Sequence, residues 1–135
     1  MGRKARLCRR VFPWACCVIV ALLAAPAVSA HQTAQNKGVS VTLHVAPDDA
    51  PAAGTPAQII VTKVKTRKGS FSWKSCTCYL NIKDASGRVV LNRRASKRMK
   101  FTFPKSGAYQ LTFAGFVKRG GKRVHFSVPF AIRAD

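Results

Sequence analysis

The sequence predicts an all-β protein, a seven-stranded antiparallel β-sandwich that follows an N-terminal export signal. Beyond residue 38, short segments alternate apolar and polar side chains with the period of two that is typical of half-buried strands. Groups of Gly, Pro, Asp and Ser separate these segments at short intervals. Beyond residue 30, no segment has the periodicity of an amphipathic helix. Residues 31–135 are enough for one domain with one core.

The first 30 residues have the three-part pattern of a secretory signal peptide. Five basic residues and no acid lie in residues 1–10, an apolar stretch follows over 14–28, and Val28-Ser29-Ala30 is a small-x-small cleavage signal. The apolar stretch is shorter than the roughly 20 residues that span a bilayer. We expect residues 1–30 to be cleaved, so that no transmembrane segment remains and the protein is periplasmic or secreted. An uncleaved N-terminal anchor is the alternative, and Arg9-Arg10 leaves open whether export is general or twin-arginine.

The mature chain is expected to begin with a flexible segment, residues 31–38, and to continue as one sandwich domain over residues 39–135. Pro129 cannot donate a ladder hydrogen bond, so its strand is expected to lie at an edge or to contain a bulge. We expect strands at residues 39–45, 58–65, 76–83, 88–93, 99–103, 109–113 and 124–132.

Residues 104–113 (PKSGAYQLTF) contain the pattern of a tyrosine corner, in which a tyrosine hydroxyl bonds back to the backbone at the start of strand F of an immunoglobulin-like domain. Gly107 and Tyr109 hold the structural positions of that turn, and Leu111 stands where antibody domains have a cysteine. On this pattern and the strand spacing, the chain resembles small bacterial periplasmic immunoglobulin-like domains of the FixH-like and YtkA-like kind, and more distantly the CopC-like copper-resistance domains. The resemblance implies an immunoglobulin-like β-sandwich.

In CopC-like proteins a histidine at the mature N-terminus binds copper, and His31 occupies that place after the expected cleavage. The further Asp-x-His ligands of that family have no match in this chain, because the residues before His125 are Arg123 and Val124. The resemblance therefore implies copper as a cofactor only through His31.

Cys76 and Cys78 are the most specific chemical feature of the mature chain, because exported proteins seldom keep free thiols. Two residues apart on a regular strand, their Cα atoms would be about 6.6 Å apart, near the upper limit for a disulfide. An irregular strand would allow a structural or redox disulfide. Alternatively, two thiolates on one face hold a soft ion such as Cu(I), with His31 as a further ligand, or the pair consists of buried thiols or bonds to another chain.

The mature chain is strongly basic. It keeps 19 Lys and Arg residues against four Asp and no Glu, a net charge of +15. Outside the membrane, such a charge indicates attraction to an anionic envelope component or an acidic protein and not to nucleic acid, although a generally solvated basic surface would have the same composition. The candidate partner-binding residues lie at strand ends and turns: Arg67, Lys68, Arg93, Arg94, Lys97, Arg98, Lys118, Arg119, Lys122 and Arg123.

No catalytic constellation is evident. The only adjacent acids, Asp48 and Asp49, lie in a Pro- and Ala-rich connection, and no glycine-rich loop precedes a helix. We therefore expect an exported, non-enzymatic binding or accessory domain that docks on an anionic envelope component or acidic protein through its basic surface. The alternatives are a periplasmic copper-binding protein that uses Cys76 and Cys78, and a thiol-redox protein that uses the same pair.

Overall fold

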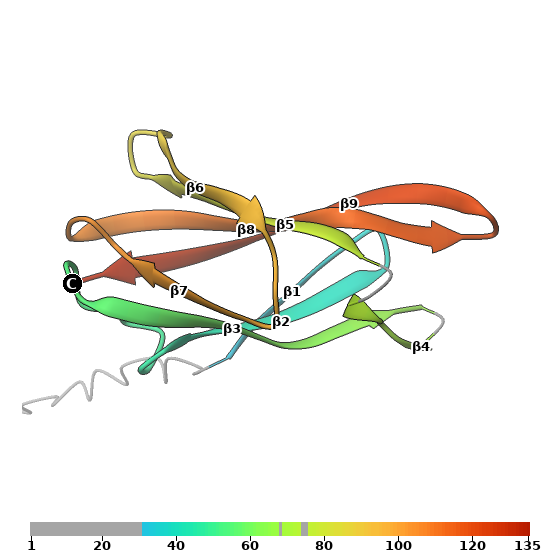
Figure 1. Ribbon diagram of the computed structural model, residues 1–135, viewed down its shortest axis with the longest axis horizontal. Coiled ribbons are helices and arrows are strands. Elements are labelled where there is room, and N and C mark those ends of the chain that lie inside the picture. The colour runs from blue at the N-terminus through green and yellow to red at the C-terminus, as the bar shows by residue number, and fades with distance from the viewer. Residues whose placement is uncertain (1–30, 68, 74–75) are drawn as a thin grey trace, which may run out of the picture.

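The computed structural model describes residues 31–135 except 68, 74 and 75, and these residues form a sandwich of two antiparallel β-sheets (Figure 1). The expected signal peptide lies outside the described residues. The strands of the described part are β1 (Gln32–Asn36), β2 (Val39–Ala46), β3 (Pro56–Thr66), β4 (Gly69–Ser70), β5 (Thr77–Asp84), β6 (Val89–Arg94), β7 (Arg98–Thr102), β8 (Gly107–Arg119) and β9 (Lys122–Ala134).

One sheet has the order β1-β2-β3, with β4 and β7 both pairing with β3, and the other has the order β6-β5-β8-β9. In chain order, β2, β3 and β7 correspond to strands A, B and E of an immunoglobulin-like sandwich, and β5, β8 and β9 correspond to C, F and G. The predicted all-β sandwich is confirmed. The predicted number of seven strands was too low, since β1 and the two-residue β4 were not expected.

Strand β1 lies within residues 31–38, the segment expected to be flexible, where the sequence pattern predicted no strand. It pairs with β2 through a tight turn at Lys37 and Gly38, both of which have positive φ, 47° and 75°. Gln32 Nε2 donates to the Ala131 carbonyl at 3.0 Å, and Asn36 Oδ1 accepts from the Ser127 amide at 3.4 Å. Polar side chains therefore fasten β1 along the open edge of β9, a tertiary contact that apolar periodicity does not reveal.

The core consists of the inward faces of both sheets. Every second residue of β2 is buried, from Val39 to Val45, as the alternation in the sequence predicts. Three phenylalanines are fully buried between the sheets: Phe103, Phe113 and Phe126. Strand β9, which contains Pro129, is an edge strand of its sheet, one of the two expected settings.

Phe71 and Trp73 cover the core at the end where β5 begins. Both are partly buried, and Trp73 meets Phe113 edge-to-face with ring centroids 5.9 Å apart. Phe71 in turn packs edge-to-face on Trp73 at 5.8 Å. These rings pack against the protein's own interior, as large aromatic side chains usually do.

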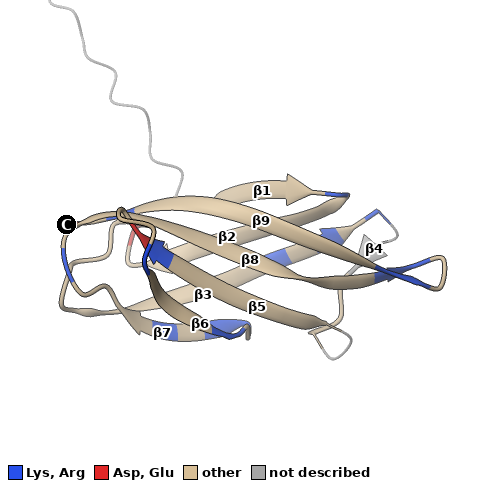
Figure 2. Cartoon of the chain, turned by 90° about the horizontal axis from the view of Figure 1, so that it is seen from above, with Lys and Arg blue, Asp and Glu red and all other residues tan. Residues whose placement is uncertain are grey.

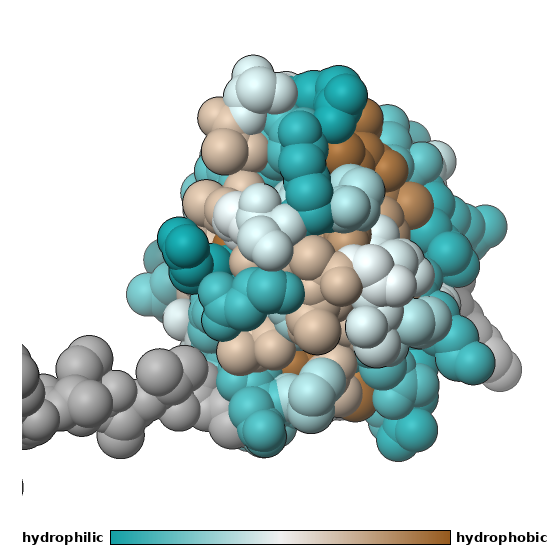
Figure 3. Space-filling view, turned by 90° about the vertical axis from the view of Figure 1, so that its left-hand side faces the viewer, coloured by the Kyte–Doolittle hydropathy of each residue, from teal (hydrophilic) through white to brown (hydrophobic). Residues whose placement is uncertain are grey.

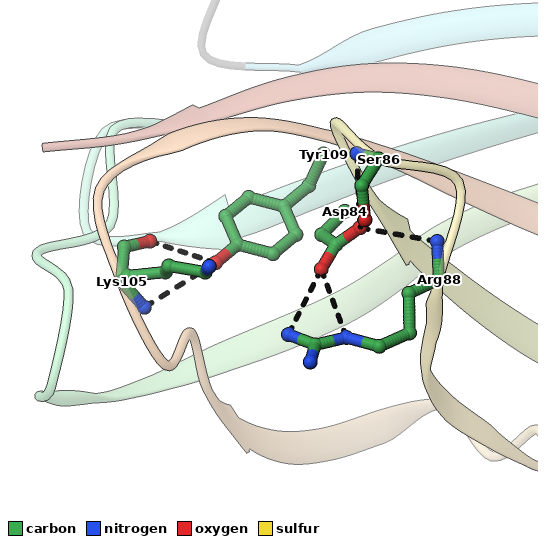
Figure 4. A network of polar contacts seen from close by, with 5 residues as sticks. All are labelled: Asp84, Ser86, Arg88, Lys105 and Tyr109. Carbon is green, nitrogen blue, oxygen red and sulfur yellow. Dashed lines mark hydrogen bonds and ion pairs between the residues drawn. The ribbon is translucent and has the colours of Figure 1, made fainter.

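The tyrosine corner is present at the start of β8 (Figure 4). The Tyr109 hydroxyl donates to the Lys105 carbonyl at 2.7 Å and accepts from the Lys105 amide at 3.3 Å. Its ring packs edge-to-face on Phe103, with centroids 4.9 Å apart. Gly107 has φ of 139°, a backbone conformation that side chains disfavour. Gly107 and Tyr109 thus have the structural roles expected of them.

Candidate anion-binding surface

The four acidic residues of the chain all lie at one end of the sandwich. Asp48 and Asp49 follow β2, Asp84 ends β5, and Asp135 follows β9. The strand register places Asp84 opposite Tyr109 at the start of β8, and the Asp135 amide donates to the Pro51 carbonyl at 3.1 Å. The C-terminus marks this end in Figures 1 and 2. Seen directly in Figure 3, it is a mixture of hydrophilic and apolar side chains.

The opposite end therefore carries positive charge with no acid among its residues. It is formed by the β1–β2 turn, the last residues of β3 and the β8–β9 hairpin, whose strands are blue toward the tip in Figure 2. We call this surface the cationic end. Its described basic residues are Lys37, Lys63, Lys65, Arg67, Lys118, Arg119, Lys122 and Arg123.

Two guanidinium groups of the cationic end meet over Gly38. A methyl group on Gly38 would lie 2.8 Å from Arg119 Nη2 and 3.0 Å from Arg67 Nε, so both side chains lie directly above this glycine. Arg119 Nη2 also donates to the Lys37 carbonyl at 2.6 Å. A shallow hollow of about 160 Å³ lies beside them, lined by Thr66, Arg67, Val117, Lys118 and Arg119.

Lys63 and Lys65 lie on the exposed face of β3, where like charges face each other. A hydrogen bond and the charge of Lys65, with a smaller effect of burial, lower the pKa of Lys63 from its ordinary value of 10.5. A bound anion would relieve this repulsion and raise that pKa again. The two ammonium groups therefore add to the positive charge of the cationic end.

Phe116 adds an aromatic ring to the outer face of β8 close to the hairpin. Phe116 is 36% exposed, and the Arg123 guanidinium carbon lies 4.5 Å from the centroid of its ring, a cation–π contact. The His125 ring meets Phe116 at 5.2 Å. Phe116, Lys118 and Arg123 line a second open hollow together with Thr77 and Val117.

The structure brings some of the candidate partner-binding residues together and leaves others apart. Arg67 lies beside the basic residues of the β8–β9 hairpin, whereas Arg93 and Arg94 end β6, and Lys97 and Arg98 lie at the link into β7. These four residues lie where the chain crosses between the sheets, as the Val61 amide donating to the Lys97 carbonyl at 2.9 Å shows. The predicted partner-binding residue Lys68 lies outside the described residues.

Cys76 and Cys78 form a disulfide in the core. Strand β5 begins at Thr77, so Cys76 precedes the regular ladder, and the Cα atoms are 5.3 Å apart instead of the regular-strand distance. Both residues are buried, 4% and 1% exposed, beside Gly115. In the disulfide neither sulfur is a thiolate. His31 lies far from the cysteine pair, at the end of the sandwich that carries the four acids, because its neighbour Gln32 pairs with Leu43.

A histidine–aspartate cluster that the sequence did not reveal lies beside His31. The rings of His31 and His44 stack at 4.9 Å, and His44 Nδ1 lies 3.1 Å from Asp49 Oδ1. Asp49 Oδ1 also accepts the Val45 amide at 2.5 Å, and the Asp49 side chain is only 1% exposed. His44 is thus mostly covered, and His125 lies at the other end of the sandwich. Within residues 31–135, as far as they are described, no three His, Cys, Asp or Glu side chains are grouped to hold a metal ion.

Asp84 is the centre of the polar network in Figure 4. Its Oδ1 accepts from the Ser86 hydroxyl at 2.6 Å and from two backbone amides, and its Oδ2 pairs with Arg88 Nη2 at 3.0 Å. The pKa of Asp84 is lowered, chiefly by the hydrogen bond from the Ser86 side chain and also by the two backbone amides and the charge of Arg88. Burial opposes this shift only in part. This carboxylate fastens the β5–β6 turn and is poorly suited to act as a general acid.

In the described part of the chain, no helix is long and apolar enough to cross a membrane. Comparisons of the chain with protein-family models, with curated proteins and with solved structures find no match.

Proposed function

We propose that this protein is an exported, non-enzymatic binding module that docks its cationic end on an anionic component of the cell envelope. The observation that carries the proposal is the segregation of charge: all four acids lie at one end, and two turns and a strand end gather eight basic residues at the other. A basic surface that is merely solvated would not require the acids and the basic residues to gather at opposite ends.

The physical consequence is a strong directional field. A surface of one charge sign raises the local concentration of oppositely charged partners and orients their approach. Because the basic side chains are mostly exposed, salt screens their attraction over about 8–10 Å at physiological ionic strength. Binding through the cationic end is therefore expected to weaken steeply as salt rises.

The test is binding of the purified protein to vesicles with and without anionic lipid, over a series of salt concentrations. A hairpin variant, Lys118→Gln/Arg119→Gln/Lys122→Gln, is compared with an edge variant, Arg93→Gln/Arg94→Gln/Lys97→Gln. Both variants remove three positive charges. We expect the hairpin variant to lose most of the salt-sensitive binding and the edge variant to keep most of it. Equal losses would mean that net charge, and not the cationic end, drives association.

The copper and thiol-redox alternatives depend on Cys76 and Cys78. The burial of both sulfur atoms in a disulfide favours a structural role over either alternative. A Cu(I) titration of reduced protein, beside a Cys76→Ser/Cys78→Ser variant, tests the first alternative. One-to-one binding that disappears in the variant would support a copper site.

A further inference from the structure

We propose that Arg67 and Arg119 form a binding site for a phosphomonoester group above Gly38. This inference rests on the proposed function and deepens it, because it names the anion and the side chains that recognise it. The two arginines come from the end of β3 and the end of β8, which are far apart in the sequence.

The site is held in place by the turn between β1 and β2. Arg119 donates to the Lys37 carbonyl at 2.6 Å, which fixes one of its N–H groups and orients the guanidinium plane. Gly38 lets both guanidinium groups approach, since any side chain there would lie about 3 Å from each of them. A preorganised pair of this kind loses less conformational freedom when it binds than two freely moving side chains would.

The electrostatics call for an anion with more than one negative charge. Two positively charged groups lie side by side, Lys118 lines the same hollow, and every acidic residue of the chain lies at the other end of the sandwich. A phosphomonoester carries about −1.5 to −2 charges at pH 7 and has three acceptor oxygens. A carboxylate or a phosphodiester carries one negative charge and would neutralise only one of the two arginines.

The geometry of the donors points to the same ligand. A guanidinium group presents a planar fork of N–H donors that matches two oxygen atoms of a phosphate. A carboxylate has only two oxygens and is satisfied by one fork, whereas the tetrahedral phosphomonoester can accept from two guanidinium groups that approach from different directions. The hollow beside the arginines is open, so the group can be free phosphate or the end of a larger molecule.

The experiment measures binding of the purified protein to phosphatidylcholine vesicles that contain either phosphatidic acid, a phosphomonoester, or phosphatidylglycerol, a phosphodiester. The lipid fractions are adjusted to give the same surface charge. We expect tighter binding to phosphatidic acid, and we expect Arg67→Gln/Arg119→Gln to weaken it about tenfold or more through lost charge-assisted hydrogen bonds. The matched control, Arg93→Gln/Arg94→Gln, removes the same charge and is expected to keep the preference.

A second variant, Arg67→Lys/Arg119→Lys, separates shape from charge. It keeps both positive charges but lacks the fork, so it is expected to bind both vesicles while losing the preference for the phosphomonoester. Circular dichroism and thermal unfolding confirm that each variant is folded before binding is compared. A fully retained preference in this variant and in Arg67→Gln/Arg119→Gln would overturn the site.

Inorganic phosphate distinguishes the source of the group. If phosphate competes at the concentrations at which phosphatidic acid binds, the site takes free phosphate, and if only the vesicle binds tightly, it takes a lipid-borne phosphate. Both results support the site. Equal binding to the two anionic vesicles, with no effect of the arginine variants, overturns this inference and leaves the docking function intact. Binding to neither vesicle rejects the docking function itself. Polyglutamate, a polymer of carboxylates, is the remaining comparison, and tighter binding to it than to phosphatidic acid overturns the choice of phosphate as the ligand.

Discussion

Gly115 and Cys78 are direct partners across the β5–β8 ladder, and the glycine is what makes room for the disulfide. A methyl group on Gly115 would lie 2.8 Å from Cys78 Sγ and 2.9 Å from the Thr77 carbonyl oxygen. Both distances are shorter than van der Waals contact allows. The disulfide and the missing side chain at position 115 therefore form one packing unit in the core.

Gly115→Ala is expected to destabilise the protein by about 1–3 kcal/mol, the usual effect of overpacking a rigid core. Chemical denaturation with urea measures the change. Combining it with Cys76→Ala/Cys78→Ala removes the sulfur but not the backbone clash, so the cost of the added methyl should shrink without vanishing. A Gly115→Ala effect that is identical in both backgrounds would show that the disulfide is not what position 115 accommodates.

Reduction of the Cys76–Cys78 disulfide is expected to be slow while the protein is folded. Both sulfur atoms are buried, so a reductant reaches them only after local opening of the start of β5. The rate of thiol appearance with dithiothreitol, followed by alkylation and mass spectrometry, should rise sharply on adding denaturant. Fast reduction of the native protein would instead favour the thiol-redox alternative.

Removing the disulfide should have a modest effect on stability. The bond spans one intervening residue, so its constraint on the unfolded chain contributes only about 1–2 kcal/mol. Comparing urea unfolding of the oxidised and fully reduced protein measures this contribution. A loss of 5 kcal/mol or more, roughly the upper end of the range for disulfides, would mean that the bond has a larger role in the native core than its short ring implies.

Tyr109→Phe removes the hydroxyl that joins Tyr109 to both backbone groups of Lys105. Since those groups are partly buried, we expect a loss of about 1–3 kcal/mol in the free energy of unfolding. Tyr79→Phe is the matched control, because Tyr79 is 45% exposed on the outer face of β5, and its effect should be within about 0.5 kcal/mol. Equal effects of the two changes would argue against a stabilising tyrosine corner.

The lowered pKa of Asp84 predicts that the protein loses stability in acid through this carboxylate. Because its pKa in the folded protein is lowered from the ordinary value of 3.8, its contribution is complete above that value and is lost as the pH falls through the lower folded-state pKa. Asp84→Asn should therefore flatten the dependence of stability on pH below about pH 4. Asp48→Asn removes the same charge from an exposed position outside this network. If both variants keep the wild-type acid dependence, the Asp84 network is not its source.

The strands with clear alternation could be predicted from the sequence because burial on one face imposes it. This holds for β2, β5 and β9, whose inward residues are buried as expected, and for the tyrosine corner, where Gly107 and Tyr109 are only two positions apart in the chain. Strand β1 was missed, because its residues are mostly polar and its stability comes from pairing with β2 and from hydrogen bonds to β9.

For the candidate site, the sequence predicted only an excess of basic residues at strand ends and turns. Arg67 and Arg119 were recognised as basic turn residues, but Gly38, over which they meet, was not. The partnership of His44 with Asp49 was also missed, because it depends on how the chain turns after β2. Such contacts join residues through folding geometry that no local pattern encodes.

Local sequence patterns are enough to predict the all-β class, the approximate strands, the tyrosine corner and the excess of positive charge. Each of these follows from local rules: the period of a strand, the backbone preference of a turn, or a count of charges. The folded chain alone shows that the acids gather at one end and that Arg67 and Arg119 meet above Gly38 at the other. The reason is physical, since sheet register and strand order set which distant turns become neighbours, and electrostatic and binding properties depend on those distances.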